Sequence, residues 1–282
     1  MRFVDDDKIY VRQSWLNDAL MCPERARLME KNPELRREND SAMMGTACHT
    51  AIEAILNNEI DAGDAGDYAV HAFRSAEQDL WAQNKQIYVT NTDPAKWDTH
   101  IHSMASAWVR DILPVVPLGG ETEHKFAVHV GSVKNALYEY ELYFEGTIDY
   151  VHPSGLWDWK TSARKYSEVE KQTQNIQSAL YVEAMVRAGV LEYPSNFSFG
   201  VMIRNASSSG QVVSVKRTEG HGSWVIQQAQ ALINGILLSK IYLPDERWLI
   251  NDQHFLCSDR WCPVWSMCKG AHIKGSTSVE EA

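Results

Sequence analysis

The sequence predicts a mixed α/β fold: a β-sheet flanked by helices, with a helical region ahead of it and a cysteine-rich coil after it. Two patterns in the 282 residues predict this fold. Apolar residues recur at helical spacing through the first third of the chain, and apolar and polar residues then alternate, as in half-buried strands. An apolar share of 44% is enough for a packed core.

Helical patterns dominate the region ahead of the sheet. The expected helices lie at residues 14–28, 43–57, 68–85 and 94–113. Ser14 is the expected N-cap of the first, because its hydroxyl can accept a hydrogen bond from a free backbone N–H. The last ends before the Pro- and Gly-rich residues 114–120. We therefore expect the helical part to cover about residues 12–118.

Alternating apolar and polar residues mark the sheet that follows. The expected strands lie at residues 126–133, 137–151, 156–160, 197–203 and 212–216. One helix is expected over residues 168–188, stopped by Gly189, and another over residues 224–241. These elements form the expected α/β core at about residues 119–243.

The net charge of -10 is unusual for a protein that binds nucleic acid, because Lys and Arg normally neutralise the phosphates. A local basic path, or divalent cations bound at an acidic site, would be sufficient. The candidate basic stretches are Arg25, Arg27, Lys31, Arg36 and Arg37, and later Lys160, Arg164, Lys165 and Lys171. The alternative for each is a solvated helix face.

The five cysteines and the lack of long apolar runs bear on the cellular compartment. No stretch approaches the roughly 20 apolar residues of a membrane span, and the first residues do not resemble a signal peptide. We expect a cytoplasmic protein with no membrane segment, in which cysteines serve as metal ligands or reactive thiols and not as disulfides. Three of them lie in the cysteine-rich segment, about residues 244–275, and the chain is expected to form one domain, residues 1–282.

Two carboxylates and a lysine are expected to share a pocket on neighbouring strands. Asp158 and Lys160 alternate with Trp159, so their side chains point to the same face of a strand, and Asp149 at the end of the preceding strand can meet them. The carboxylates and a main-chain carbonyl, such as that of Trp159, suit Mg²⁺ or Mn²⁺. Lys160 would then serve the attacking water or the charge on phosphorus. Asp-x-Lys alone is more typical of a surface ion pair.

The neighbouring residues strengthen the functional interpretation. Gly146-Thr147-Ile148-Asp149, then Asp158-Trp159-Lys160-Thr161, then Gln177 and Tyr181 four residues apart on a helix, follow one another in the sequence. In this order they resemble three successive motifs of the RecB-like PD-(D/E)XK nucleases. The resemblance implies a restriction-endonuclease-like fold, with Gln177 and Tyr181 placing the phosphate or Lys160. Ordinary helix packing is the alternative for that pair.

An upstream helix adds a further motif. Gly45, His49 and Glu53, spaced by four, resemble the first helical motif of the same family, in which the histidine is a metal ligand. A lone helical histidine is more often structural. Glu123, just before the first expected strand, resembles another acidic position of the family.

Four of the cysteines resemble a cluster-binding set. Cys22-Pro23, and Cys257, Cys262 and Cys268 about 235 residues later, resemble the one-plus-three arrangement of the iron–sulfur members of this family, which implies a [4Fe–4S] cluster. Four thiolates equally suit structural zinc, so spacing alone leaves both metals open, and the resemblance favours iron–sulfur. Cys48 is expected to be a buried packing residue, whereas Trp261 and Trp265 are expected to shield the metal from solvent.

The resemblance implies a metal-dependent DNA exonuclease that resects ends for recombination or repair. Its partners would be DNA and a recombination protein, such as a single-strand annealing protein or a helicase, since the sequence has no Gly-x4-Gly-Lys-Thr motor motif of its own. The oligomeric state is left open. Two other classes compete: a non-catalytic DNA-end-binding or scaffold subunit that keeps the metal cluster, and a zinc-stabilised module with an unrelated activity.

Overall fold

A computed structural model describes residues 1–5, 7–35, 38–90, 92–173, 175–205, 207–242 and 247–272. The chain divides into two compact units, which are described separately. The terminal unit comprises Met1–Arg36, Val130–Tyr143 and Ile226–Ala282. The central unit comprises Arg37–His129 and Phe144–Val225.

A mixed sheet runs through the described residues, as the sequence predicts. Its seven strands are β1 (Arg2–Val4), β2 (Lys8–Arg12), β3 (Glu121–Lys134), β4 (Glu139–His152), β5 (Gly155–Ser162), β6 (Ser195–Ile203) and β7 (Ser209–Arg217). The order is β1-β2-β4-β5-β6-β7, and β3 also pairs with β4. Strands β5 and β6 are parallel, whereas β1–β2, β4–β5 and β6–β7 are antiparallel. Strands β1 and β2 lie ahead of the first predicted helix and were not expected.

Strand β5 is largely buried and lies between β4 and β6 in the sheet. Its apolar residues alternate with Asp158 and Lys160, and even Asp158 is only 2% exposed. The ring of Trp159 lies on the opposite face, across from Gly200 of β6 in the parallel register. A Cβ at position 200 would come within 2.6 Å of the Trp159 ring, so this close approach requires glycine.

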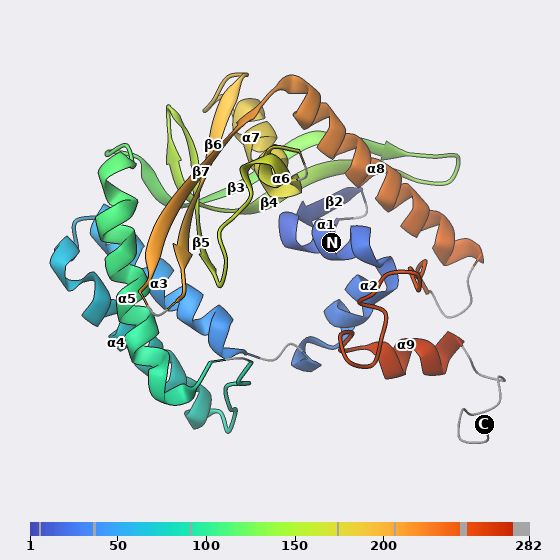
Figure 1. The fold of residues 1–282 in the computed structure, drawn as a ribbon. Helices are drawn as coiled ribbons and strands as arrows, with labels where there is room; N and C mark the ends of the chain where they lie inside the picture. Colours follow the sequence, from blue (N-terminus) through green and yellow to red (C-terminus); the bar gives the residue numbers. More distant parts are fainter. Residues whose placement is uncertain are drawn as a thin grey trace. The chain divides into compact units, whose positions relative to one another are not determined.

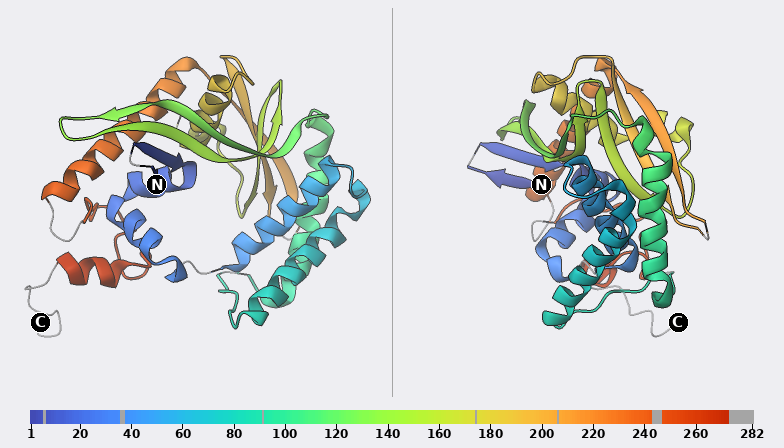
Figure 2. Two further views of the ribbon diagram at one scale, coloured as in Figure 1. Left: turned by 180° about the vertical axis from the view of Figure 1, so that it is seen from behind. Right: turned by 90° about the vertical axis from the view of Figure 1, so that its left-hand side faces the viewer.

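Three helices pack together in the central unit, beside strands β5 to β7 (Figures 1 and 2). They are α3 (Asp40–Leu56), α4 (Ala65–Ala82) and α5 (Trp97–Asp111). Asn39 begins α3 because its side chain accepts a hydrogen bond from the Ala42 N–H. The fully buried Trp108 of α5 meets Trp159 edge to face, with ring centroids 5.4 Å apart. This aromatic contact joins the helical layer to β5.

Two shorter helices contact strands β6 and β7, namely α6 (Glu168–Thr173) and α7 (Ile176–Arg187). The prediction of one continuous helix over residues 168–188 is therefore wrong. Asn175 has an extended backbone, with φ -139°, and its side chain accepts a hydrogen bond from the Ser178 N–H. An asparagine that can satisfy a free N–H in this way favours the start of a new helix over continuation of the old one.

The terminal unit also divides an expected helix. The expected helix at residues 14–28 is in fact two helices, α1 (Gln13–Met21) and α2 (Pro23–Lys31). They are separated by Cys22, whose backbone is extended. The residue before a proline is disfavoured in helical conformation, and Pro23 is well suited to the first helical position. Arg12, not Ser14, occupies the N-cap of α1.

Helix α8 (Glu219–Tyr242) follows β7, close to the expected residues 224–241. The segment expected to be coil contains a further helix, α9 (Trp265–His272), which corrects that expectation. Short 3-10 turns lie at Pro33–Leu35, Ala62–Asp64, Pro94–Lys96 and Leu113–Val115.

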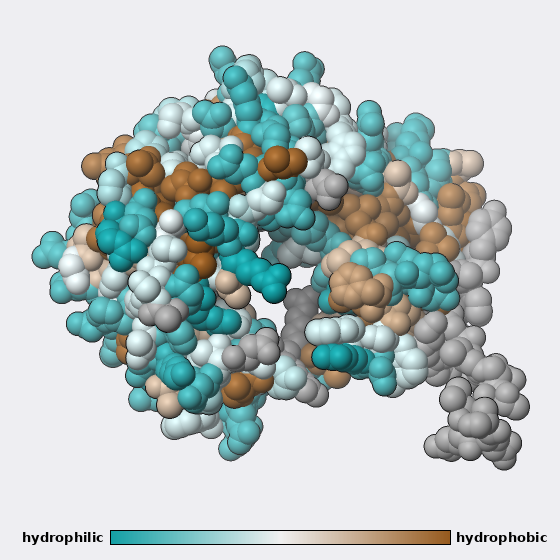
Figure 3. Space-filling model, in the orientation of Figure 1, coloured by the Kyte–Doolittle hydropathy of each residue, from teal (hydrophilic) through white to brown (hydrophobic). Residues whose placement is uncertain are grey.

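The described helices are not of the membrane-spanning kind, since none combines the necessary length with sufficient apolar character. On the face shown in Figure 3, hydrophilic residues cover most of the surface, and hydrophobic residues lie in separate patches.

Candidate functional site

The carboxylates of Asp149 and Asp158 are brought together by the pairing of β4 with β5. The antiparallel register places Tyr150 opposite Trp157, so the next pair along the two strands is Asp149 and Asp158. The Trp159 N–H donates a hydrogen bond of 2.6 Å to Asp149 Oδ2. Lys160 Nζ lies 2.5 Å from Asp158 Oδ2. The carboxylates of Asp149 and Asp158, the Trp159 N–H and the Lys160 ammonium therefore meet where β4 and β5 run side by side.

Helix α3 adds His49 to the same place. Its Nδ1 lies 3.6 Å from Asp149 Oδ2. One helical turn earlier, Gly45 faces β5, where an added Cβ would lie 3.0 Å from Thr161 Oγ1. The missing side chain at position 45 thus lets the helix backbone lie close against β5, and this closeness brings His49 within reach of the carboxylate.

Helix α7 supplies Gln177 and Tyr181. Gln177 Nε2 donates a hydrogen bond of 2.6 Å to Asp158 Oδ1. The buried ring of Tyr181 packs edge to face on Phe126, with centroids 5.6 Å apart, and its phenol is close enough to Asp158 and Lys160 to interact with their charges. Burial first, and then Asp158, raises the pKa of Tyr181 to about 12. The phenol is therefore a neutral hydrogen-bonding group at physiological pH.

The charges of this pocket are poorly balanced. Burial and the neighbouring Asp158 raise the pKa of Asp149 above its usual value. Burial would lower the pKa of Lys160, but Asp158 and Asp149 outweigh it and raise the pKa. Burial and the Lys160 ammonium lower the pKa of His49 to about 4, so the imidazole is neutral near pH 7. A pocket with two carboxylates, one ammonium and a neutral imidazole favours an additional cation.

Glu53 and Glu123 lie near each other at the edge of this group. Burial and Glu53 raise the pKa of Glu123, and Glu123 in turn contributes to the raised pKa of Asp149. Glu123 has a positive φ of 47°, an uncommon conformation for a residue with a side chain. The upstream acidic residues therefore belong to the same electrostatic neighbourhood as the carboxylate pair.

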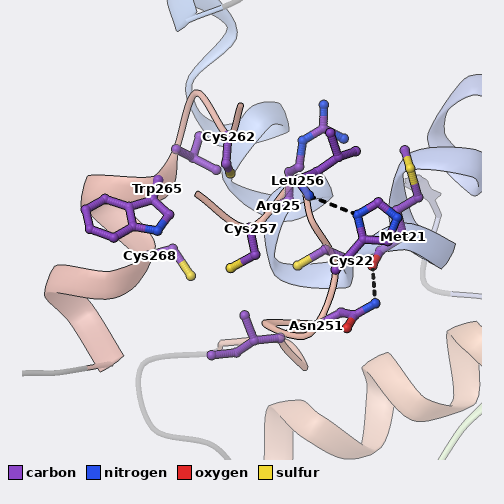
Figure 4. Close-up of a pocket in the computed structure, with 12 residues that line it drawn as sticks. Met21, Cys22, Arg25, Asn251, Leu256, Cys257, Cys262, Trp265 and Cys268 are labelled. Carbon is purple, nitrogen blue, oxygen red and sulfur yellow. Dashed lines mark hydrogen bonds between the residues drawn. The ribbon is translucent and has the colours of Figure 1, made fainter. Parts of the chain in front are cut away.

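The four cysteines of the one-plus-three set line a single pocket in the terminal unit, here called the cysteine pocket. In Figure 4 the sulfurs of Cys22, Cys257 and Cys268 are directed toward one another, with Cys262 beside them. Cys22 comes from the α1–α2 junction, whereas the other three come from the loop before α9 and from α9 itself. All are free thiols, so no disulfide closes the pocket.

Apolar side chains form most of the remaining wall of the cysteine pocket, among them Leu256, Val264 and Trp265. Burial raises the pKa of Cys268 to about 11, and the other cysteines of the pocket add to this shift. Thiols this close together and this poorly solvated ionise reluctantly unless a cation neutralises them.

Two further expectations, one about the tryptophans near the cysteine pocket and one about Cys48, have different outcomes. Trp265 lines the pocket, but Trp261 is 54% exposed and lies under the Arg260 guanidinium, so the expected shielding by Trp261 is wrong. The cation–π contact holds its ring at the surface. Cys48 is fully buried in the central unit, in the core beside α5, as a packing residue.

Donor chemistry is the test of whether these pockets fit a metal ion. Carboxylates, a neutral imidazole and a main-chain carbonyl form a set suited to Mg²⁺ or Mn²⁺, and Asp158 Oδ2 is buried without a hydrogen bond, paired only with the Lys160 ammonium. Four thiols suit a soft or borderline metal. As the side chains lie, no three His, Cys, Asp or Glu of the described residues are arranged as ligands of one ion. The donor types therefore suit a hard divalent cation at the carboxylates and a soft or borderline metal at the thiols. Their geometry does not itself form a ligand set in the described residues.

The candidate basic stretches fare unequally. Arg25 pairs with Asp18, and Arg27 pairs with Glu24, which fits the alternative of charged helix faces. Arg36 and Arg37 lie outside the described residues. In the later stretch, Lys160 lies in the pocket, and Lys171 is close enough to interact electrostatically with Lys160 and Asp158.

The fold and this pocket can be compared with known proteins. A family model described as the PD-(D/E)XK nuclease superfamily matches residues 13–269. The chain belongs to the PD-(D/E)XK nuclease superfamily. This membership supports a nuclease with DNA as its substrate, and members of the superfamily generally use divalent metals such as Mg²⁺.

Among solved structures, one from Eubacterium rectale named "Putative exonuclease" is similar, with a TM-score of 0.54 and 11% identity over 91% of this chain and 92% of that chain. At that identity the likeness is one of fold. A second, SSO0001, has a TM-score of 0.36 and 11% identity over 95% of this chain and 88% of that chain, too low a score to support an argument. No curated protein sequence matches the chain.

Sequence reasoning missed two features of the pocket formed by Asp149, Asp158, Lys160 and His49, which is here called the candidate active-site pocket. The first is the Trp159 N–H, which holds Asp149, because a main-chain donor has no signature in the sequence. The second is Tyr166, which is close enough to Asp158 and Lys160 to interact with their charges. An aromatic residue between Lys165 and Lys171 is a weak signal that could have directed attention to it.

Proposed function

We propose that this protein is a metal-dependent deoxyribonuclease that hydrolyses phosphodiester bonds, acting as an exonuclease on DNA ends. The observation that supports it best is the group of Asp149, Asp158 and Lys160 side by side on β4 and β5 in a chain of the PD-(D/E)XK nuclease superfamily. The likeness in fold to a structure named as an exonuclease favours end-directed cutting.

The residues that would hold the divalent cation are Asp149, Asp158, the Trp159 carbonyl and His49. When bound, Mg²⁺ or Mn²⁺ supplies a Lewis acid for the phosphoryl group and lowers the pKa of water. His49 is suited to this role because its neutral imidazole, with a pKa of about 4, needs to lose no proton near pH 7. Because burial and Asp158 raise the pKa of Asp149, a bound cation would favour the ionised form of this carboxyl, and the ionised carboxyl would in turn bind the cation.

The other pocket residues would act on the substrate and on each other. Lys160, whose pKa stays raised beside two carboxylates, is a charged donor that would orient the attacking water and stabilise charge on the phosphoryl oxygens. Gln177 donates a hydrogen bond to Asp158 Oδ1. The rest of its side-chain amide would position the phosphate or Lys160. Tyr181 is a neutral phenol close to Asp158 and Lys160, so it would add a hydrogen bond to the pocket without adding charge.

For the cysteine pocket we propose a [4Fe–4S] cluster on Cys22, Cys257, Cys262 and Cys268. Four free thiols that line one largely apolar pocket support it, and structural zinc is the competing metal. The metal would join the α1–α2 junction to the α9 segment and so stabilise the terminal unit.

The cellular role that fits is resection of DNA ends for recombination or repair in the cytoplasm. A single-strand annealing protein or a helicase would be the partner, since the chain carries no P-loop motif. We further propose that residues 1–282 act as one nuclease domain, with the helical part, the α/β core and the cysteine-rich segment as its parts.

The test is digestion of end-labelled single- and double-stranded DNA by the purified protein with Mg²⁺ or Mn²⁺. Wild-type protein should release short products from the ends, and Lys160→Ala should reduce the rate by ~10²- to 10³-fold. Covalently closed circular DNA should resist, which separates exonuclease from endonuclease action. Equal rates for wild type and Lys160→Ala would overturn the proposal, and metal-dependent DNA binding without cleavage would favour the non-catalytic end-binding alternative.

A further inference from the structure

Lys171 on α6 is a half-buried cation that lies on an aromatic surface. Its Nζ lies 4.1 Å from the centroid of the Tyr166 ring and 5.4 Å from that of Phe199. The two rings meet edge to face with centroids 6.0 Å apart. No carboxylate of the described residues forms an ion pair with Lys171. The faces of the rings therefore support the ammonium in the absence of a direct ion pair.

The β5–β6 register places this cation beside the candidate active-site pocket. Asp158 of β5 is paired with Phe199 of β6, and side chains of paired residues on neighbouring strands lie on the same face of a sheet. The Phe199 ring is thus next to the Asp158 carboxylate, and Lys171 covers that ring. Burial lowers the pKa of Lys171, and the Lys160 ammonium lowers it further, whereas the carboxylates of Glu170 and Asp158 partly oppose this shift.

The helix that carries Lys171 is firmly attached to β7. The buried Arg217 of β7 donates hydrogen bonds to the carbonyl oxygens of Lys171 and Gln172, at 2.5 and 2.9 Å, and to Ser178 Oγ at 2.9 Å. Gln172 forms two more hydrogen bonds with the main chain of Lys216. Because both α6 and the first turn of α7 are tied to one guanidinium, the position of Lys171 is set by the sheet.

A structural role alone explains this arrangement poorly. A lysine on an aromatic face gains only a weak cation–π attraction, and that gain is offset here by partial burial and by a second ammonium nearby. A phosphodiester between or beside two ammonium groups would remove the repulsion, and each phosphate of a DNA strand carries one negative charge.

We propose that Lys171, supported by Tyr166, forms a phosphate subsite for the DNA strand, where its ammonium donates to a non-bridging oxygen of a phosphate that flanks the bond to be cut. The inference rests on the proposed function, since it assigns a substrate contact beside the same pocket. Lys171 acts here in binding and register, whereas Lys160 serves the reacting phosphate. Tyr166 acts through Lys171 as a positioning residue, because its ring face holds the ammonium in place.

The test compares Lys171→Gln with a matched control, Lys85→Gln, which removes the same charge from an exposed lysine that follows α4. For Lys171→Gln we expect the KM for DNA to rise by ~10-fold with kcat changed by less than ~3-fold. The slope of log KM against log salt should fall by about 0.7–0.9, the value of one lost phosphate contact. Lys171→Arg should restore most of the affinity, and Lys85→Gln should match wild type.

Tyr166 provides a second, independent variant. Tyr166→Phe keeps the ring face and should bind DNA like wild type, whereas Tyr166→Leu should weaken binding in the same direction as Lys171→Gln. Unchanged KM and salt slope in Lys171→Gln would overturn the proposal, and so would a fall in kcat alone at constant KM. A lower unfolding temperature in Lys171→Gln together with lost affinity would also overturn it in favour of a structural role.

Equilibrium binding keeps this result separate from the proposed function. Affinity for a labelled oligonucleotide, measured with Ca²⁺ in place of Mg²⁺, requires no cleavage. If wild-type protein binds but does not cut, the nuclease proposal fails while the subsite is still judged by the salt slopes of wild type and Lys171→Gln. If both proteins bind equally at every salt concentration, the subsite is overturned even when cleavage is normal.

Discussion

The two pockets of this protein are opposites in chemistry. The candidate active-site pocket of the central unit presents hard oxygen and nitrogen donors, and some of its charges already pair with one another, as in the contact of Lys160 with Asp158. The cysteine pocket presents four thiols against a largely apolar wall and contains one nearby cation, Arg25, whose guanidinium pairs with Asp18. On the proposed function, the first would bind an exchangeable hydrated cation, whereas the second would hold a permanently bound metal.

The pockets also differ in how the chain builds them. Asp149 and Asp158 are nine positions apart on paired strands, so local register brings them together. Cys22 and Cys257 come from opposite ends of the sequence and meet only when α1, α2 and the α9 segment pack. We therefore expect damage to the first pocket to remove chemistry and damage to the second to remove stability. The following predictions test this contrast.

The largest effect is expected for Asp158→Asn. The substitution keeps the shape of a buried side chain but removes the charge that pairs with Lys160 and that would bind the cation. Cleavage of end-labelled DNA should fall by at least ~10³-fold. Iron or zinc content should equal that of wild type, because the cysteine pocket is built from other residues. The exposed Asp61→Asn is the matched control and should cleave normally; substantial activity in Asp158→Asn would refute its assigned role.

The second effect is on stability and follows from Cys268→Ser. Loss of one thiolate from the cysteine pocket should release the metal, with loss of absorbance near 400 nm if it is iron–sulfur. The unfolding temperature should fall by roughly 10 °C, since several kcal/mol of metal-binding energy are lost and each kcal/mol corresponds to about 2–4 °C in a chain of this size.

Cys48→Ala is the control for that measurement. Cys48 is fully buried but lies in the central unit, so its replacement should cost about 1 kcal/mol and leave the metal content unchanged. Equal metal content in Cys268→Ser and wild type would show that the pocket does not hold the metal. If anaerobically prepared wild-type protein contains one zinc ion per chain and no iron, the metal of the cysteine pocket is zinc and the iron–sulfur proposal fails.

A third prediction concerns metal exchange. Brief treatment with EDTA should abolish cleavage, and added Mg²⁺ or Mn²⁺ should restore it, while the metal of the cysteine pocket remains bound. His49→Ala should raise the metal concentration for half-maximal activity by ~10-fold or more, with partial recovery of kcat at saturation. The exposed His129→Ala is the control. Unchanged metal dependence in His49→Ala would remove histidine from the ligand set.

The smallest effect is expected at Gly45. A Cβ there would lie 3.0 Å from Thr161 Oγ1, so Gly45→Ala requires a shift of a few tenths of an ångström between α3 and β5. Because His49 lies one turn further along the same helix, the rate should fall by ~2- to 10-fold, and Gly45→Val should be worse. Gly63→Ala is the control, since an added Cβ there meets nothing within 4 Å. Full activity in Gly45→Val would show that the close approach does not position His49.

Much of the site could be inferred from the sequence because its residues obey local rules. Alternation along a strand predicts that Asp158 and Lys160 share a face, and spacing by four predicts the same for Gln177 and Tyr181. The division of two expected helices was not inferred, although the signals at Pro23 and Asn175 were present. Apolar periodicity continues through both breaks, and it outweighed the capping preferences of two single residues.

The sequence by itself determined the fold class, the order of the motifs and the chemical types of the donors, since these depend on residue identity and on spacing over a few positions. Tertiary structure alone decided the contact of His49 with Asp149, the use of the Trp159 N–H and the place of Lys171 over Phe199. The physical reason is that these contacts join residues of different helices and strands. Each of these contacts depends on how a helix packs on a sheet or on which strands are neighbours, and local spacing carries no information about either.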